Sequence, residues 1–160
     1  MRYNQIRECD IANGRGIGIS VFIQGCPSQH CKGCFNPETW DFCGGKEWTE
    51  DVEKSVLELA NKPYIKRISL LGGECLAKEN VTEVTKFAKR CKELFPEKEI
   101  WLWSRYDFKE YISNLEIIQY LDYIVDGKFI EELKDNTLLY RGSSNQKVWV
   151  KKNEEWSILL

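Results

Sequence analysis

The 160-residue sequence has one histidine, one methionine and four prolines, and it lacks a hydrophobic run long enough to span a membrane. Its first stretch, MRYNQIRECDIANG, lacks the apolar core of a secretory signal peptide. Lysine and arginine are evenly spread and the net charge is -2, so no basic stripe indicates nucleic-acid or anionic-membrane binding. We therefore expect a soluble cytoplasmic protein with no nucleic-acid or membrane partner.

Internal repeats, low-complexity segments and linkers are also missing from the sequence. Hydrophobic residues make up 42% of the chain, which is ordinary for a globular protein. A chain of this length suits one domain with its own core. We predict a single domain over residues 1–160.

Apolar periodicity predicts alternating strands and helices. The predicted strands are GISVFIQG (18–25), RISLLGG (67–73), EIWLW (99–103), LDYIVDG (121–127) and LLYRG (138–142). The predicted helices are 49–62, 80–95 and a third that starts at Asp107 and carries Tyr111, Leu115 and Ile118. Thr49 is a predicted N-cap, and Asn80 with Glu83 forms a predicted capping box. This alternation indicates an α/β fold with a mainly parallel sheet and right-handed crossovers.

Unusual segments follow the predicted strands. They are the cysteine loop GCPSQHCKGCFN (25–36), GGE (72–74), SRY (104–106), DGK (126–128) and RGSSNQ (141–146). Ligands bind at the carboxyl ends of parallel strands, in barrels and in open sheets alike. We therefore expect these five segments to form one site at that edge.

Seven cysteines is an odd number, and three of them, Cys26, Cys31 and Cys34, lie in the cysteine loop. In a reducing compartment, clustered cysteines usually bind metal. Zinc would need a fourth ligand such as Cys43 or His30, and a plant-type [2Fe–2S] cluster would need a distant cysteine such as Cys75. A [4Fe–4S] cluster held by three cysteines would keep one iron open for the amine and carboxylate of a substrate. The spacing alone leaves these three possibilities open.

Several motifs, in this order, are more specific than the cysteine spacing. They are YNQIRECDIANGRG, FIQGC with the following GCFNPETW, LGGECL, IWLWSRY, VDGKF and RGSSNQ. Over nearly the whole chain the sequence resembles the radical S-adenosylmethionine (SAM) enzymes. Within them it resembles the proteins that activate anaerobic ribonucleoside-triphosphate reductase.

The resemblance implies a partial (β/α) barrel of radical SAM type and two cofactors, a [4Fe–4S] cluster and SAM. The cluster ligands would be Cys26, Cys31 and Cys34. The reduced cluster would cleave SAM, and the 5′-deoxyadenosyl radical would take a hydrogen atom from a glycine of the reductase, leaving a glycyl radical. The implied partners are the large glycyl-radical subunit of the reductase and an electron donor such as flavodoxin. A homodimer is a further expectation.

The resemblance also implies which residues surround SAM. These are Gly33, Cys34 and Phe35 beside the adenine, Gly72, Gly73 and Glu74 at the methionine amino group, Ser104 near the ribose, and Asp126 and Lys128 at the charged methionine groups. The segment from Arg141 to Gln146 would contact either SAM or the partner protein. For Asp126 and Lys128 an exposed ion pair is the simpler alternative, and for the glycines it is an ordinary turn.

The sequence departs from the family pattern in the cysteine loop. Four residues separate Cys26 from Cys31, where the family usually has three, and His30 takes the place expected for the second cysteine. Cys31 keeps the usual spacing to Cys34, so we predict that Cys31 is the ligand and that the loop bulges with His30 turned away. Three other positions differ from the residues common in the family: Arg15, Cys75 and Arg105.

Three alternative functions remain. The chain would be another small radical SAM enzyme if the RGSSNQ match were coincidental. From a different class, it would be an iron–sulfur electron carrier or a zinc-stapled binding module. Metal and sulfide content separates these classes.

Overall fold

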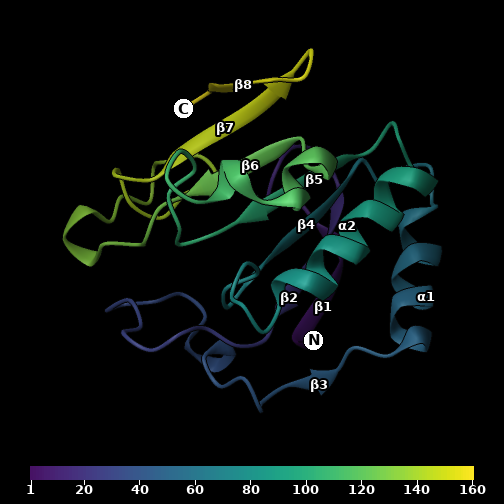
Figure 1. Cartoon of the computed structure of the whole chain (residues 1–160), viewed down its shortest axis with the longest axis horizontal. Coiled ribbons are helices and arrows are strands. Elements are labelled where there is room, and N and C mark those ends of the chain that lie inside the picture. Colours follow the sequence, from purple (N-terminus) through teal and green to yellow (C-terminus); the bar gives the residue numbers. More distant parts are fainter.

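A single mixed sheet runs through the computed structural model, which describes residues 1–160 (Figure 1). The strand order is β3-β1-β2-β4-β5-β6-β7-β8. The strands are β1 (Arg2–Asp10), β2 (Gly18–Ile23), β3 (Lys46–Glu47), β4 (Arg67–Gly72), β5 (Glu99–Trp103), β6 (Tyr123–Asp126), β7 (Lys147–Lys152) and β8 (Glu155–Ile158).

The central strands β2, β4, β5 and β6 are parallel, as predicted. The outer pairings are antiparallel, so the prediction of a mainly parallel sheet is wrong outside this centre. Two of these pairs follow from their connections, because β1 is joined to β2 by the short segment 11–17 and β7 turns directly into β8. Short connections of this kind reverse the chain, whereas parallel neighbours need a longer crossover.

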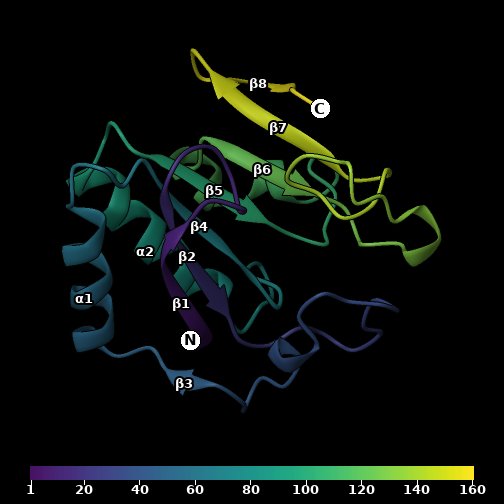
Figure 2. The same ribbon diagram turned by 180° about the vertical axis from the view of Figure 1, so that it is seen from behind.

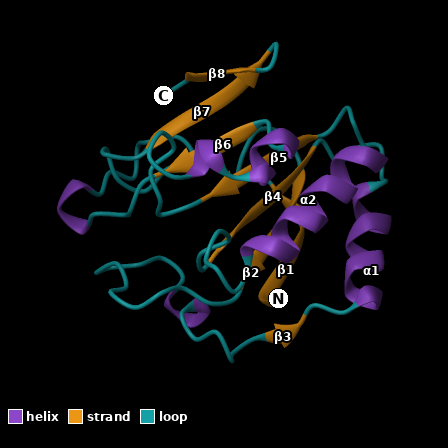
Figure 3. Cartoon of the chain, viewed as in Figure 1, coloured by secondary structure: helices purple, strands orange, loops and turns teal.

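Two helices cover one face of the sheet: α1 (Glu50–Ala60) and α2 (Val81–Leu94) (Figures 1 and 3). The predicted N-cap of α1 is confirmed, because the Thr49 hydroxyl accepts a hydrogen bond from the Val52 amide. The predicted capping box of α2 is wrong. The Asn80 side chain makes no cap and instead donates to the carbonyls of Gln24 and Glu74.

The predicted third helix is absent as an α-helix. Two short 3-10 turns replace it, η2 (Ile112–Asn114) and η3 (Glu116–Tyr120). Leu115 between them is extended, and each turn buries one isoleucine, Ile112 or Ile117. β-Branched residues such as these isoleucines favour an α-helix only weakly, so local propensity gives the predicted helix little support.

The predicted strand at 138–142 is also wrong. Tyr140 has a φ of 65°, a left-handed conformation that interrupts an extended run. The antiparallel neighbour of β6 is β7, which begins after the RGSSNQ segment. The segment is therefore a loop between β6 and β7.

Apolar side chains pack on both faces of the sheet. The larger cluster lies between the sheet and the two helices and includes Ile19, Val21 and Ile23 of β2. On the opposite face, Trp101 stacks on Tyr123 with ring centroids 4.0 Å apart. The connection 11–17 crosses this second face (Figure 2).

Because the four central strands are parallel, the segments that follow them leave the sheet at one edge. The cysteine loop and the connection 127–146 lie on this same side of the molecule (Figures 1 and 2). The connection includes the short turn η4 (Glu131–Leu133). No helix has the length and apolar character that crossing a membrane requires.

Candidate functional site

One cavity of about 140 Å³ at the carboxyl edge is lined by all three cysteines of the cysteine loop. Seven of the eleven residues predicted for the cluster or SAM line it: Cys26, Cys31, Cys34, Phe35, Gly72, Gly73 and Ser104. Four do not line it: Gly33, Glu74, Asp126 and Lys128. Gly127 and Gln146 also line the cavity, so each of the five segments expected to form the site contributes at least one lining residue.

The donor set of this cavity suits an iron–sulfur cluster. All seven cysteines are free thiols, but neither Cys43 nor Cys75 lines the cavity. Cys75 is fully buried in the core, and burial raises the pKa of its thiol well above the ordinary value. The side chains do not form a ready-made group of three or more His, Cys, Asp or Glu around a single metal ion. Three partly exposed thiols facing one space fit a cluster better than a four-ligand zinc site.

The cysteine loop accommodates its extra residue through a left-handed backbone. Gln29 has a φ of 65°. The next residue, His30, stacks on Trp40 with ring centroids 4.2 Å apart, and its Nε2 lies 3.1 Å from the Cys26 carbonyl oxygen. The imidazole is therefore engaged by the loop itself, as expected for a residue that does not bind the metal.

Two cations reach the cysteine loop from neighbouring strand ends. The Arg105 guanidinium donates to the carbonyls of Pro27 and Gln29, at 3.3 Å each, and Nη1 lies 3.9 Å from Cys26 Sγ. Lys128 Nζ donates to the same Gln29 carbonyl at 3.0 Å. Burial raises the pKa of the Cys26 thiol, and the hydrogen bond from Arg105 opposes this shift.

Glu74 joins the ends of β4 and β5 from inside the protein. It is 1% exposed, and its carboxylate accepts hydrogen bonds from the Ser104 hydroxyl and the amides of Arg105 and Leu76, at 2.7–2.9 Å. Burial raises its pKa, while these hydrogen bonds act in the opposite direction. Its acceptors are occupied, so Glu74 shapes the wall of the cavity.

The structure explains why glycine is needed at Gly72, the last residue of β4, and at Gly73 after it. A Cβ on Gly73 would overlap the Gly25 carbonyl oxygen and lie 2.9 Å from that of Thr39. Gly72 has a φ of 116°, and a Cβ there would lie 2.7 Å from the Ile23 carbonyl oxygen. Close packing of backbone on backbone therefore explains both glycines, although both also line the cavity.

Asp126 and Lys128 do not form the ion pair considered as an alternative. Asp126 is 3% exposed and accepts hydrogen bonds from the amides of Phe108 and Lys147. Lys128 points instead to Gln29 of the cysteine loop. Asp126 therefore holds the end of β6 in place, and Lys128 supports the loop.

Gln146 organises the RGSSNQ segment. Its side-chain oxygen accepts from the amides of Gly142 and Ser143, and its Nε2 donates to the Gly127 carbonyl. Asn145 donates to the Lys128 carbonyl. These bonds fasten the segment to the end of β6 beside the cavity.

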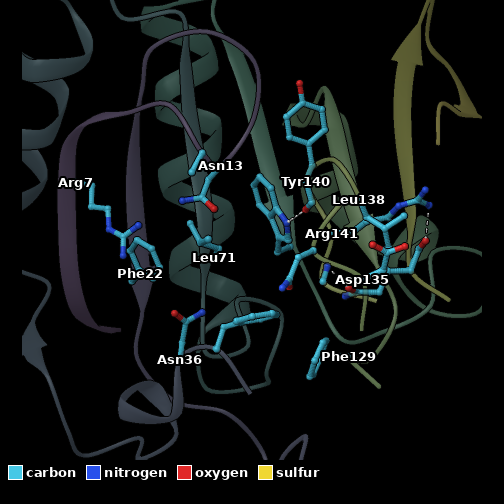
Figure 4. A pocket seen from close by; sticks show the side chains of 16 residues that line it. Arg7, Asn13, Phe22, Asn36, Leu71, Phe129, Asp135, Leu138, Tyr140 and Arg141 are labelled. Carbon is cyan, nitrogen blue, oxygen red and sulfur yellow. Dashed lines mark hydrogen bonds between the residues drawn. The ribbon is translucent and has the colours of Figure 1, made fainter. Parts of the chain in front are cut away.

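A second, larger cavity of about 520 Å³ opens on the face of the sheet opposite the two helices. Figure 4 shows Phe22 and Leu71 on one side of it and Tyr140 and Arg141 on the other. Six residues line both cavities: Phe35, Asn36, Leu71, Trp103, Phe129 and Gln146. The two cavities therefore adjoin.

The sequence reasoning missed several residues of the site. Trp40 stacks on His30, and Phe129 packs on Phe35 with ring centroids 5.1 Å apart. Trp103 lines both cavities and donates to the Tyr140 carbonyl. All three aromatic residues lie within the sequence motifs that carry the family resemblance. Their place in those motifs is the signal by which the sequence could have identified them.

Comparisons with known proteins agree with this site. A family model described as a 4Fe-4S single cluster domain matches residues 12–149. The chain is 37% identical over 156 residues to the anaerobic ribonucleoside-triphosphate reductase-activating protein of Enterobacteria phage T4, covering 98% of each chain. It is 38% identical over 151 residues to the protein of the same name in Escherichia coli K12, covering 92% of this chain and 97% of the relative.

Proposed function

The chain belongs to the 4Fe-4S single cluster domain family and to the anaerobic ribonucleoside-triphosphate reductase-activating proteins, and on this premise we propose how its site works. It is a radical SAM activating enzyme that generates a glycyl radical on the reductase. The proposed cluster ligands are Cys26, Cys31 and Cys34. The observation that carries the proposal is that these three thiols, alone among seven, line one cavity at the carboxyl edge of the parallel strands.

SAM is the proposed second cofactor. Cys26, Cys31 and Cys34 would hold the [4Fe–4S] cluster, which would supply the one electron needed for reductive cleavage of SAM and so for glycyl-radical formation on the reductase. The protein contributes binding, orientation and exclusion of competing reactions. We place SAM across the smaller cavity, between the cysteine loop and the ends of β4 and β5.

The proposed contacts divide into two kinds. The adenine would lie beside backbone and ring groups of Gly33, Cys34 and Phe35. The methionine end would meet backbone groups of Gly72 and Gly73, and the ribose would lie near Ser104. Glu74 and Asp126 act by holding these segments, because their carboxylate oxygens already accept hydrogen bonds from the chain. Lys128 is proposed to add positive charge at the methionine carboxylate.

The larger cavity is the proposed entry for the reductase. It adjoins the cysteine-lined cavity through six common residues, so a loop inserted there would end beside SAM. We propose a partial (β/α) barrel of radical SAM type, with β2, β4, β5 and β6 as its parallel wall. An electron donor such as flavodoxin, a cytoplasmic location and a homodimer complete the proposal.

The test starts from protein that has been purified and reconstituted without oxygen. Iron, sulfide and zinc contents are measured first, followed by the electron paramagnetic resonance (EPR) spectrum with and without SAM. We expect about four irons and four sulfides per chain, a spectrum that SAM alters, and 5′-deoxyadenosine after reduction. Stoichiometric zinc without sulfide, or a cluster spectrum indifferent to SAM, would reject the proposed chemistry.

A further inference from the structure

The cysteine loop has almost no backbone hydrogen bonds of its own between its first two cysteines. Residues 27–30 take part in no backbone–backbone hydrogen bond, either as donor or as acceptor. The flanking residues are tied, since the Cys26 amide donates to the Trp40 carbonyl and the Cys34 amide to the Cys31 carbonyl. Side chains from elsewhere must therefore fix the path from Cys26 to Cys31.

Two cations provide hydrogen bonds of this kind, in addition to the contacts of His30 with the Cys26 carbonyl and the Trp40 ring. Arg105 follows β5 and Lys128 follows β6, and both donate to the carbonyl of Gln29 at the left-handed turn. Arg105 also reaches the Pro27 carbonyl. A planar guanidinium can serve two acceptors at once, whereas a lysine ammonium is a single point charge on a flexible stem.

Both cations reach the cysteine loop without a carboxylate partner at ion-pair distance. Neither Arg105 nor Lys128 forms an ion pair with a carboxylate. The Glu74 carboxylate accepts from the Arg105 backbone amide rather than from its guanidinium. The Cys26 sulfur lies 3.9 Å from Arg105 Nη1. A positive charge at this distance favours the more negative of the two redox states of a bound cluster.

We propose that Arg105 and Lys128 form a cationic clamp, defined by their three hydrogen bonds to the carbonyls of Pro27 and Gln29. The clamp holds the long cysteine loop so that Cys31 faces the same cavity as Cys26 and Cys34. Arg105 is thus a positioning residue, and its charge raises the reduction potential of the bound cluster. The inference about the potential rests on the proposed function, but the inference about the loop does not.

The loop is tested first on metal-free protein by ¹⁵N relaxation. In the wild type, we expect backbone order parameters of residues 28–32 near the rigid value of about 0.85, and in Arg105→Gln a fall to below about 0.6. Arg105→Lys should give an intermediate value, because it restores the charge but not the fork. Arg90→Gln is the matched control, since Arg90 pairs with Glu53 on the helical side, away from the loop.

The charge is tested on reconstituted protein by redox titration and chelator challenge. In Arg105→Gln, the midpoint potential should move in the negative direction and iron should be lost faster than in the wild type. Arg105→Lys should restore the potential more than the iron retention. If Arg105 acted only by holding the loop, Arg105→Lys would restore the midpoint potential and the iron retention to the same degree.

Deletion of Gln29 tests the coupling, because it removes the carbonyl that both cations bind. In that background, Arg105→Gln should cause a smaller loss of iron than in the wild type, because only the Arg105 contact with the Pro27 carbonyl remains. Thermal unfolding checks that each variant folds. If the Gln29 deletion variant does not fold, the comparison of Arg105→Gln with Arg105→Lys tests the clamp instead. Unchanged order parameters in Arg105→Gln, or an equal fall in Arg90→Gln, would overturn the clamp. A wild type without a cluster would instead reject the proposed function and leave the relaxation test intact.

Discussion

Gly73→Ala is the most informative single substitution in the wall of the site. An added Cβ would overlap the carbonyl oxygen of Gly25 and lie 2.9 Å from the carbonyl oxygen of Thr39. Cβ atoms in proteins essentially never come within 3.0 Å of another heavy atom. Both obstacles are backbone atoms, so rotation of a side chain cannot relieve them. Gly25 directly precedes Cys26, and its carbonyl accepts the Glu74 amide at 2.8 Å. The alanine should therefore push the base of the cysteine loop away from β4.

The cost follows from two parts of this displacement. Overpacking against a rigid neighbour costs about 1–3 kcal/mol, and weakening the bond between Glu74 and Gly25 adds about 0.5–1.5 kcal/mol. We expect the free energy of unfolding of the metal-free protein to fall by about 2–4 kcal/mol. Because the loop base moves, iron content and SAM binding should decrease together.

The assays are urea unfolding, iron content after anaerobic reconstitution, and SAM titration of the same sample. Gly16→Ala is the control: Gly16 has a φ of 67°, but its Cβ would meet only Lys66 side-chain atoms at 3.5 Å. It should cost about 1–2 kcal/mol in backbone strain and leave the cluster in place. A stable, cluster-loaded Gly73→Ala that fails only to bind SAM would refute the backbone explanation. The glycine would then serve the ligand directly.

Three further predictions concern the same site. Cys31→Ser should abolish cluster binding and Cys43→Ser should retain it, as measured by iron and sulfide content; the reverse result would overturn the ligand assignment. His30→Ala should keep the EPR signal of the cluster unchanged because the imidazole stacks on Trp40, whereas nitrogen hyperfine coupling from His30 in the wild type would contradict this. Burial raises the pKa of Glu74, so the native state binds the carboxyl proton more tightly than the unfolded chain does. The free energy of unfolding should therefore fall as the pH rises from about 4.3, the unfolded value, through the folded pKa. Glu74→Gln should flatten that part of the pH profile, measured by urea midpoints on metal-free protein, and an unchanged slope would exclude Glu74 as its source.

The central parallel strands could be predicted from the sequence because each one combines an apolar run with a following loop. The outer strands were not predicted. The two-residue β3 carries no apolar pattern, and in β8 no residue is buried. The third helix was predicted from its spacing, but Leu115 is extended and divides the segment into two turns. The helix propensity of the β-branched residues in this segment was too weak to make it one continuous helix.

Within the site, the sequence located the segments but not the roles of their charged residues. Glu74 and Asp126 stood in motifs expected to face SAM, yet their carboxylates bind backbone amides from distant parts of the chain. Arg105 was noticed only as a departure from the family pattern. Its contact with the cysteine loop joins positions 78 and 76 residues apart, and no local pattern encodes such a pairing.

The most direct test of the central claim is EPR of the reductase after incubation with this protein, SAM and a one-electron reductant under anaerobic conditions. We expect a stable glycyl radical on the reductase that requires SAM and is absent with Cys31→Ser. We also expect Cys43→Ser to support the same signal as the wild type. A reconstituted protein that carries a [4Fe–4S] cluster and binds the reductase, but yields neither 5′-deoxyadenosine nor a glycyl radical, would contradict the account.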